Sequence, residues 1–288
     1  MTSNRVCKIL GITKPVVQAP LLMITSPKLC AAVSNAGGLG CLGINIRGKP
    51  EATLAGMRKS IQEMKKLTNK PFAINAFPKS SDHFGLKDGL INICKEEGVK
   101  VIVFVGKTSE KEIQELKQQG FTVITRELTP TIKGAQKAER AGADIIVATG
   151  CDEGGIMPNN HTGTISQVAL LSSAVKVPIL AAGAIINEKM AKASAIVGAE
   201  GAFVGTRFIL SEENPVPPMA KNDILNTPAD DYVVAPFMSG FARHKKSPEQ
   251  ANNKGFGNNT LALCNLAPLI KSIEPCKKIV EEIARGYL

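Results

Sequence analysis

A recurring pattern of polar and apolar positions runs through the middle of the chain. A polar, amphipathic stretch ends near a glycine, and four or five continuous apolar residues follow it. The clearest copies are Gly98 with 101–105, Gly120 with 121–124, Gly142 with 145–148, and Gly198 with 201–204. Glycine suits the left-handed residue that ends a helix, because it has no Cβ. Continuous apolar runs fit strands that are covered on both faces, so the repeat predicts an α/β protein with a parallel sheet.

Four more runs of this kind bring the predicted strands to eight. They lie at 16–19, 39–42, 72–75 and 179–182. Helices are predicted at roughly 26–36, 50–68, 86–97, 109–119, 131–141, 166–175 and 188–197. Eight βα units in about 210 residues are typical of a TIM (β/α)8 barrel. A doubly wound open sheet is the alternative, but it usually has fewer strands, and its G-x-G-x-x-G motif is absent after the first one.

The repeat stops at about residue 213. Prolines interrupt the next part, and the asparagine- and glycine-rich stretch 252–259 is predicted to be an exposed loop. The segment 275–285 is amphipathic and can complete the ring of helices. We therefore expect residues 1–212 to form the barrel core. Residues 213–288 are expected to form a C-terminal extension that packs on the barrel and can cover part of its mouth.

Composition supports a folded, soluble chain. Of its 288 residues, 44% are hydrophobic and 21% are charged, which excludes a disordered chain. No apolar run approaches the ~20 residues of a membrane helix, and the first residues lack the apolar core of a signal peptide. The seven cysteines are scattered and form no CxxC pair, so neither a disulfide framework nor a structural zinc site is expected. These features predict a cytoplasmic protein with no membrane association and no bound metal.

The charge balance is basic, with 35 Lys and Arg against 25 Asp and Glu. The basic residues share their segments with acidic ones, as on solvated helix faces. Tryptophan is absent and there are two tyrosines, so stacking platforms for nucleic acid are scarce. We therefore expect a small-molecule partner, anionic by preference, and no nucleic acid. The sequence is also compatible with a homodimer.

In TIM barrels the active site lies at the C-terminal ends of the strands. The loops after strands seven and eight commonly bind phosphate through backbone N–H groups. Here these loops contain Gly183-Ala184 and Gly205-Thr206, without a carboxylate that would repel an anion. Thr206 adds a hydroxyl donor. The alternative is that these glycines serve only as turn residues.

The loop after strand six, residues 149–164, is long and polar. His161 can donate or relay a proton there, or it is simply a solvated loop histidine. Cys151 can be a nucleophile, but a small packing residue is the better interpretation. Asp152 and Glu153 can bind a metal, but adjacent loop carboxylates are usually solvated.

Several short segments together resemble one known family. They are 17–21, 34–40, 72–75, 141–144 with Gly154-Gly155, 178–185 and 198–208. In this order they resemble the nitronate monooxygenase (2-nitropropane dioxygenase-like) family, whose relatives include flavin-dependent enoyl-acyl carrier protein reductases. The resemblance spans about residues 10–213.

The resemblance implies FMN bound in a TIM barrel. It places the flavin phosphate on Gly183, Ala184, Gly205 and Thr206. It places the isoalloxazine ring near Ala19, Pro20, Leu21, Met23, Asn75, Gly154 and Gly155. Thr125, Thr149 and Gly150, at the ends of neighbouring strands, complete the predicted cofactor site.

Three positions depart from the family pattern. Members often carry a histidine directly after the two glycines, where this chain has Ile156. Thr149 replaces a frequent glutamine, and Ala184 replaces the second glycine of the phosphate turn, although alanine still offers its N–H. His161 is then the candidate catalytic residue.

The resemblance leaves three functions open. The first is oxidation of alkyl nitronates by FMN and O2, with Lys107 or a cationic His161 holding the anion. The second is an NAD(P)H-dependent flavin reductase of enoyl thioesters or quinones, in which NAD(P)H is a co-substrate. The third is a flavin- or phosphate-binding barrel without turnover.

Overall fold

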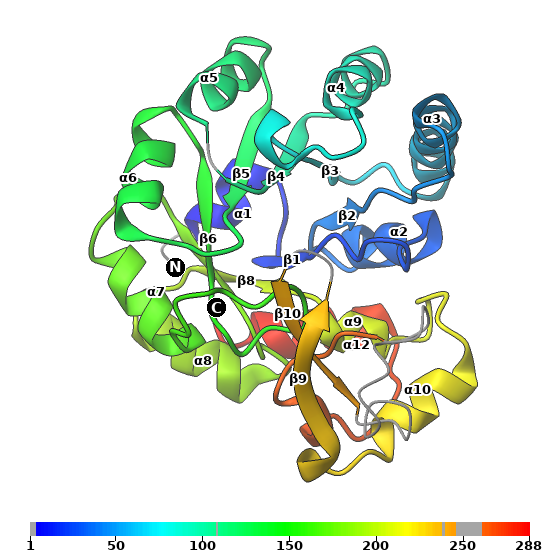
Figure 1. Cartoon of the computed structure of the whole chain (residues 1–288), viewed down its shortest axis with the longest axis vertical. Helices are drawn as coiled ribbons and strands as arrows, with labels where there is room; N and C mark the ends of the chain where they lie inside the picture. Colours follow the sequence, from blue (N-terminus) through cyan, green and yellow to red (C-terminus); the bar gives the residue numbers. More distant parts are fainter. Residues whose placement is uncertain (1–3, 108, 238–239, 246–260) are drawn as a thin grey trace.

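The computed structural model describes residues 4–107, 109–237, 240–245 and 261–288. Its centre is an eight-stranded parallel sheet in the order β1-β8-β7-β6-β5-β4-β3-β2 (Figure 1). Its strands are β1 (Val16–Gln18), β2 (Gly40–Leu42), β3 (Phe72–Ala76), β4 (Val101–Val105), β5 (Thr122–Arg126), β6 (Ile145–Thr149), β7 (Ile179–Ala182) and β8 (Gly201–Val204). The two ends of this order meet at a parallel bridge between Val17 and Leu39, which closes the sheet. The predicted TIM barrel is therefore confirmed.

Helices connect the strands where the sequence pattern predicts them. They are α2 (Pro27–Asn35), α3 (Pro50–Leu67), α4 (Lys87–Glu96), α5 (Glu110–Gln118), α6 (Ile132–Arg140), α7 (Thr164–Ser172) and α8 (Glu188–Ile196). Four of them begin after a polar residue whose side chain accepts a backbone N–H of the first turn: Ser26, Ser109, Thr131 and Asn187. Such caps satisfy N–H groups that have no partner within the helix.

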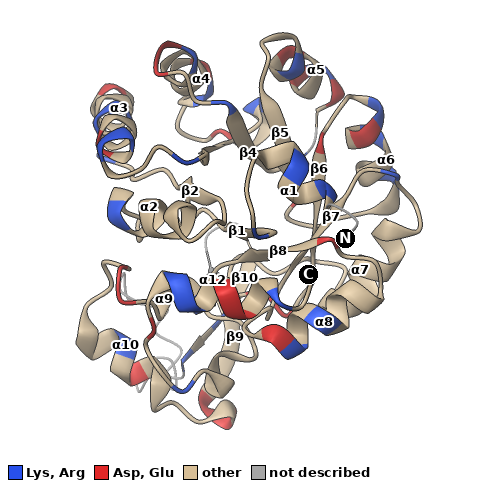
Figure 2. Cartoon of the chain, turned by 180° about the vertical axis from the view of Figure 1, so that it is seen from behind, with Lys and Arg blue, Asp and Glu red and all other residues tan. Residues whose placement is uncertain are grey.

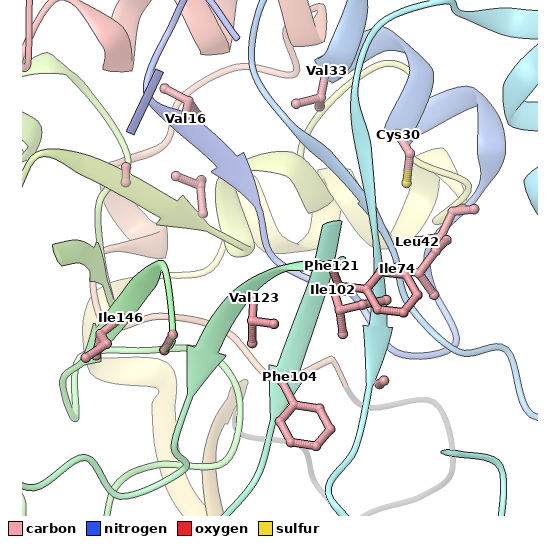
Figure 3. Close-up of a cluster of buried hydrophobic side chains, with 14 of the residues drawn as sticks. Val16, Cys30, Val33, Leu42, Ile74, Ile102, Phe104, Phe121, Val123 and Ile146 are labelled. Atoms are coloured by element: carbon pink, nitrogen blue, oxygen red, sulfur yellow. The ribbon is translucent and has the colours of Figure 1, made fainter. Parts of the chain in front are cut away.

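Alternate residues of each strand point to two different apolar layers. In β4, Val101, Val103 and Val105 belong to the cluster inside the barrel. Ile102 and Phe104 belong to the outer cluster between strands and helices (Figure 3). Both faces of the strand are thus buried, which explains the continuous apolar run. Each fully buried side chain of this size contributes about 1.5–3 kcal/mol.

A short helix that the pattern did not predict closes one end of the barrel. Helix α1 (Arg5–Leu10) places Val6 and Leu10 in the same cluster as the inward-facing strand residues. The Nδ2 of Asn4 donates to the carbonyl of Glu200, which directly precedes β8, at 2.8 Å. Helix α1 therefore covers the N-terminal ends of the strands (Figures 1 and 2).

The C-terminal part covers the other end and also completes the helical ring. It contains α10 (Pro218–Leu225), β9 (Tyr232–Phe237), β10 (Gly240–Lys245) and α12 (Cys276–Ala284), with 3-10 turns at Ala229–Asp231 and Ala267–Leu269. Within the barrel core, the short helix α9 (Thr206–Ile209) follows β8, and a 3-10 turn, Lys79–Ser81, follows β3. The hairpin β9–β10 was not predicted, and it reaches the loop after β6, where the N–H of Met157 donates to the carbonyl of Phe241 at 2.8 Å. The predicted loop 252–259 lies outside the described residues.

Helix α12 occupies the place of the eighth barrel helix. Its residues Ile279, Val280 and Ile283 have no exposed surface and belong to the outer core layer. The helix packs between α2 and α8. Just after it, the hydroxyl of Tyr287 lies 2.6 Å from Ser194 Oγ on α8.

Basic and acidic residues are interspersed on the outer helices (Figure 2). All seven cysteines are free. Across the described ranges, the helices are too short or too polar to span a bilayer.

One ion pair between α4 and α5 is almost completely buried. Lys87 Nζ lies 2.6 Å from Glu112 Oε1, and the two side chains are 7% and 11% exposed. Burial raises the pKa of Glu112, but hydrogen bonds from the Lys87 ammonium and the Lys79 N–H outweigh it, so the pKa lies below its ordinary value. At neutral pH the fold is therefore more stable with Glu112 ionised than it would be with Glu112 protonated.

Glu112→Gln should lower the free energy of unfolding by about 3 kcal/mol at pH 7, because it leaves a buried ammonium without its main partner. The difference from the wild type should shrink as the pH falls through the lowered pKa of folded Glu112, where the wild-type carboxylate is protonated too. Urea unfolding at several pH values measures both effects. Glu110→Gln in the same helix is the control, and an equal loss in both variants would contradict the assignment.

Candidate active site

The loops predicted to bind phosphate lie side by side. Strand β7 pairs with β8 in parallel, with Ala182 opposite Phe203. The turns Gly183-Ala184 and Gly205-Thr206 directly follow these strands at the same end of the barrel. The register therefore brings together the four residues on which the phosphate prediction depends.

The turn after β7 has an unusual backbone conformation. Gly183 has φ +114°, and a Cβ at this position would lie 2.3 Å from Thr164 Oγ1 and 3.2 Å from the carbonyl oxygen of Gly150. Ala184 has φ +57°. A left-handed conformation costs a non-glycine residue about 1–2 kcal/mol, and such strain is concentrated at ligand sites. This geometry also explains why glycine fits position 184 in the family that the sequence resembles.

The turn after β8 faces the loop after β1. A Cβ at Gly205 would lie 3.7 Å from Leu21 Cδ2 and 3.9 Å from the Cβ of Ala19. The N–H of Ala19 donates to the carbonyl of Val204 at 2.8 Å, which extends the pairing of β1 and β8. Pro20 and Met23 belong to the same loop, and Met23 has φ +66° and is 56% exposed.

Part of the C-terminal extension reaches this turn. The N–H of Cys264 donates to Thr206 Oγ1 at 3.0 Å. A Cβ at Gly154 would lie 2.7 Å from both Thr206 Oγ1 and the Cys264 nitrogen. Glycine at 154 therefore allows the extension to approach the loop after β6. The Thr206 hydroxyl accepts this backbone N–H and also hydrogen-bonds the Cys264 side chain, so it ties the extension to the turn after β8.

The predicted residues at the ends of β3, β5 and β6 are buried in the mouth. The Nδ2 of Asn75 donates to the carbonyls of Ala76 and Val103 at 3.3 and 3.2 Å. Thr125 is 3% exposed and Thr149 is completely buried. Thr149 Oγ1 has no hydrogen-bond partner among the described residues, and neither has Asn45 Oδ1 in the loop after β2.

These two polar atoms test whether a flavin fits the mouth. Buried polar atoms nearly always have a partner, and an unsatisfied one costs about 1–3 kcal/mol. A ligand with both hydrogen-bond donors and acceptors, such as an isoalloxazine ring, can satisfy a hydroxyl and an amide oxygen. The chemistry of the donor set thus fits a flavin. Asn45 was missed because its loop carried no motif.

Glu153 is buried, so the prediction of solvated carboxylates was wrong for this residue, whereas Asp152 is half-buried. Asp152 Oδ2 accepts the N–H of Thr164, and Oδ1 accepts Nδ2 of Asn265, both at 2.6 Å. Glu153 Oε2 lies 2.5 Å from Arg126 Nη2 at the end of β5. Burial raises the pKa of Glu153, against the opposing effect of Arg126. In the described part of the chain, no cluster of three or more potential metal ligands occurs.

The remaining residues of this loop lie towards its outer side. His161 is exposed, with φ +51°, and the described contacts of this residue involve its backbone: its N–H donates to the carbonyl of Pro158 at 3.3 Å. Ile156 packs against Gly240 of β10, where a Cβ would lie 2.6 Å from Ile156 Cγ2. Cys151 is half-buried, and burial raises the pKa of its thiol, which makes it a weak nucleophile at neutral pH.

The closed eight-stranded parallel barrel places this chain among the TIM-barrel proteins, whose active sites lie at the C-terminal mouth. Comparison with known proteins specifies the family. The chain matches the family described as nitronate monooxygenase over residues 3–282, and it belongs to that family.

Two similar proteins and one similar solved structure match most of this chain. A (3aS,4S,5R,7aS)-5-hydroxy-7a-methyl-1-oxo-octahydro-1H-indene-4-carboxyl-CoA dehydrogenase from Rhodococcus jostii is 31% identical, over 89% of this chain and 69% of its own. A probable nitronate monooxygenase from Staphylococcus haemolyticus is 29% identical, over 88% of this chain and 79% of its own. The structure of FabK from Thermotoga maritima is 30% identical with a TM-score of 0.87, and the match covers 100% of this chain and 96% of that one. The chain is therefore an oxidoreductase of a flavin-dependent family.

Ala184→Gly should raise the free energy of unfolding by up to about 1 kcal/mol. Glycine relieves the left-handed strain, although it also gives the unfolded chain more freedom. Ala195→Gly in helix α8 is the matched control, and it should lose about 1 kcal/mol. Denaturant unfolding measures both changes. A loss of stability at position 184 as large as at 195 would contradict the strain.

Proposed function

We propose that this protein binds FMN at the C-terminal mouth of its barrel and oxidises alkyl nitronates with O2. The observation that carries the proposal is the meeting of two turns, Gly183-Ala184 and Gly205-Thr206, on neighbouring strands. Backbone N–H groups and the Thr206 hydroxyl at such turns suit a phosphate dianion. Family membership supports the flavin, and the nitronate monooxygenase relatives support the reaction.

The residues of the mouth would hold the cofactor as follows. Gly183, Ala184, Gly205 and Thr206 would bind the phosphate. The residues proposed to line the ring are Ala19, Pro20, Leu21, Met23, Asn75, Thr125, Thr149, Gly150, Gly154 and Gly155. When bound, the flavin would accept an electron pair from the substrate and pass it to O2. The protein's part is to orient both partners and to attract the anionic substrate.

A flavin reductase acting on thioesters is the second candidate, with NAD(P)H as the reductant. Two observations favour it. One similar protein has a CoA thioester in its name. The mouth also exposes large apolar side chains, Met23 at 56% and Phe241 at 53%, which can contact an apolar substrate.

Anaerobic bleaching of the bound flavin decides between these functions. Purified protein loaded with FMN is mixed without O2 either with propane-2-nitronate or with NADH and NADPH, and the visible flavin absorbance is followed. We expect rapid bleaching by the nitronate and recovery of colour on admission of O2. Fast bleaching by a nicotinamide nucleotide alone would establish the reductase instead. A yellow protein that is inert to both would be a binding barrel, and failure to bind FMN would end the proposal.

Thr149→Val should have opposite effects on the apoprotein and on flavin binding. Removing the unsatisfied hydroxyl should stabilise the apoprotein by about 1 kcal/mol, whereas losing a hydrogen bond to the ring should weaken FMN binding about tenfold. Urea unfolding and quenching of FMN fluorescence measure the two quantities. Thr122→Val is the control, because Thr122 begins the neighbouring strand β5 at the end of the barrel away from the mouth. Unchanged FMN affinity in Thr149→Val would exclude this hydroxyl from the cofactor site.

A further inference from the structure

An ion pair between Arg126 and Glu153 is buried in the mouth of the barrel. Arg126 is the last residue of β5, and Glu153 lies in the loop after β6. The guanidinium Nη2 is 2.5 Å from Oε2, and the side chains are 11% and 10% exposed. The backbone of Gly155 also hydrogen-bonds this carboxyl group. A pair of this kind fixes the position of the carboxyl group relative to the two glycines.

The second oxygen of this carboxyl group is unsatisfied. Glu153 Oε1 is buried and has no hydrogen-bond partner among the described residues. A buried ion pair seldom adds stability over apolar residues, and an unpaired charged oxygen adds a desolvation penalty. Stability therefore does not explain the pair. A buried carboxylate oxygen without a partner can be satisfied by a hydrogen-bond donor or an acidic C–H group of a bound ligand or substrate.

The pair packs directly against Gly155. A Cβ at Gly155 would lie 3.1 Å from Glu153 Oε2 and 3.9 Å from Arg126 Nη2. The Glu153 nitrogen lies 3.2 Å from the corresponding Cβ position at Gly183, in the proposed phosphate turn. Because neither glycine has a side chain, a molecule seated on this loop would meet the carboxyl group. Ile156, which follows Gly154 and Gly155 in the sequence, has no group that can take up a proton.

We propose that Glu153 is the base of this site, and that it removes the acidic proton from the carbon next to the nitro group of a neutral nitroalkane. The C–H bond breaks and an O–H bond forms on Glu153. The electron pair of the C–H bond stays on the substrate as the nitronate, so this step needs no oxidant. Arg126 holds the carboxyl group in place. The inference rests on the proposed function, because it supplies the nitronate that the flavin oxidises.

The surroundings of Glu153 suit this role. Burial raises the pKa of its carboxyl group, which makes the carboxylate more basic than an exposed one, and the adjacent guanidinium of Arg126 opposes this shift by favouring the ionised form. The other charged group on the same loop, Asp152, is occupied by Thr164 and Asn265. Arg126 is thus a positioning residue, and Glu153 is the group that touches the substrate.

Hydrogen–deuterium exchange of 2-nitropropane tests this step apart from oxidation. The FMN-loaded protein is incubated with 2-nitropropane in D2O without O2, and loss of the single hydrogen on C2 is followed by proton NMR. Exchange needs proton removal and return but no electron acceptor. We expect the wild type to accelerate exchange over buffer, and Glu153→Gln to reduce the accelerated rate at least 100-fold.

Two further variants make the result specific. Glu127→Gln removes a carboxylate beside Arg126 in sequence and should exchange like the wild type. Glu153→Asp keeps a carboxylate but shortens the side chain by one methylene, so it should catalyse exchange of 2-nitropropane at least tenfold more slowly than the wild type. If Glu153→Gln does not fold, the exchange rate of Glu153→Asp tests the proposed base. In air, the ratio of propane-2-nitronate oxidation to 2-nitropropane oxidation should rise at least 100-fold in Glu153→Gln.

The outcomes separate this inference from the proposed function. If the wild type oxidises the nitronate but does not accelerate exchange, Glu153 is not a base, although the proposed function holds. Exchange without nitronate oxidation would support the base and overturn the proposed function. If Glu153→Gln exchanges normally but binds FMN tenfold more weakly, the oxygen serves the flavin and the inference is overturned.

Discussion

Closure of the barrel at β1 is the constraint on which the site depends. This strand has three residues and pairs with β8 on one side. On the other side, backbone pairing is limited to the bridge with Leu39, where the Gln18 N–H donates to the Leu39 carbonyl at 2.9 Å. Next to this bridge the buried side chain of Gln18 adds two bonds: Nε2 donates to the carbonyl of Cys41 at 3.1 Å, and Oε1 accepts the Cys41 N–H at 3.3 Å. The amide thereby satisfies backbone groups where β1 and β2 diverge. The loop that carries Ala19 and Leu21 starts directly after this contact, so its position across from Gly205 follows from the closure.

The repeat predicted the barrel because every strand of a TIM barrel is covered on both faces and each helix ends in a recognisable way. The elements outside the repeat have weaker signals in the sequence. Helix α1 has six residues, of which Val6 and Leu10 are buried, and so short an apolar stripe gives little periodic signal. The hairpin contains Pro236, a residue that argues against a strand in a sequence, but it is tolerated here because the ribbon has two strands and both are edges.

The same reasoning explains which parts of the site could be predicted. Gly183 and Gly205 could be paired from sequence, because consecutive strands of a barrel are neighbours. That rule also brings the ends of β5 and β6 together and could have paired Arg126 with Glu153. What the sequence did not reveal is that these charges are buried. Asn265, more than a hundred residues after Asp152, donates to that aspartate, and such a contact leaves no local pattern in the sequence.

The position of α12 has a consequence for how the protein is made. About 70 residues lie between Val204, where β8 ends, and Cys276, where the helix that covers the seam between α2 and α8 begins. At about 5–20 residues per second, a ribosome needs roughly 4–14 s to synthesise this stretch. During that time the nascent chain has all eight strands but an uncovered apolar strip along the first of them. The barrel therefore cannot bury this strip until the last helix has been synthesised.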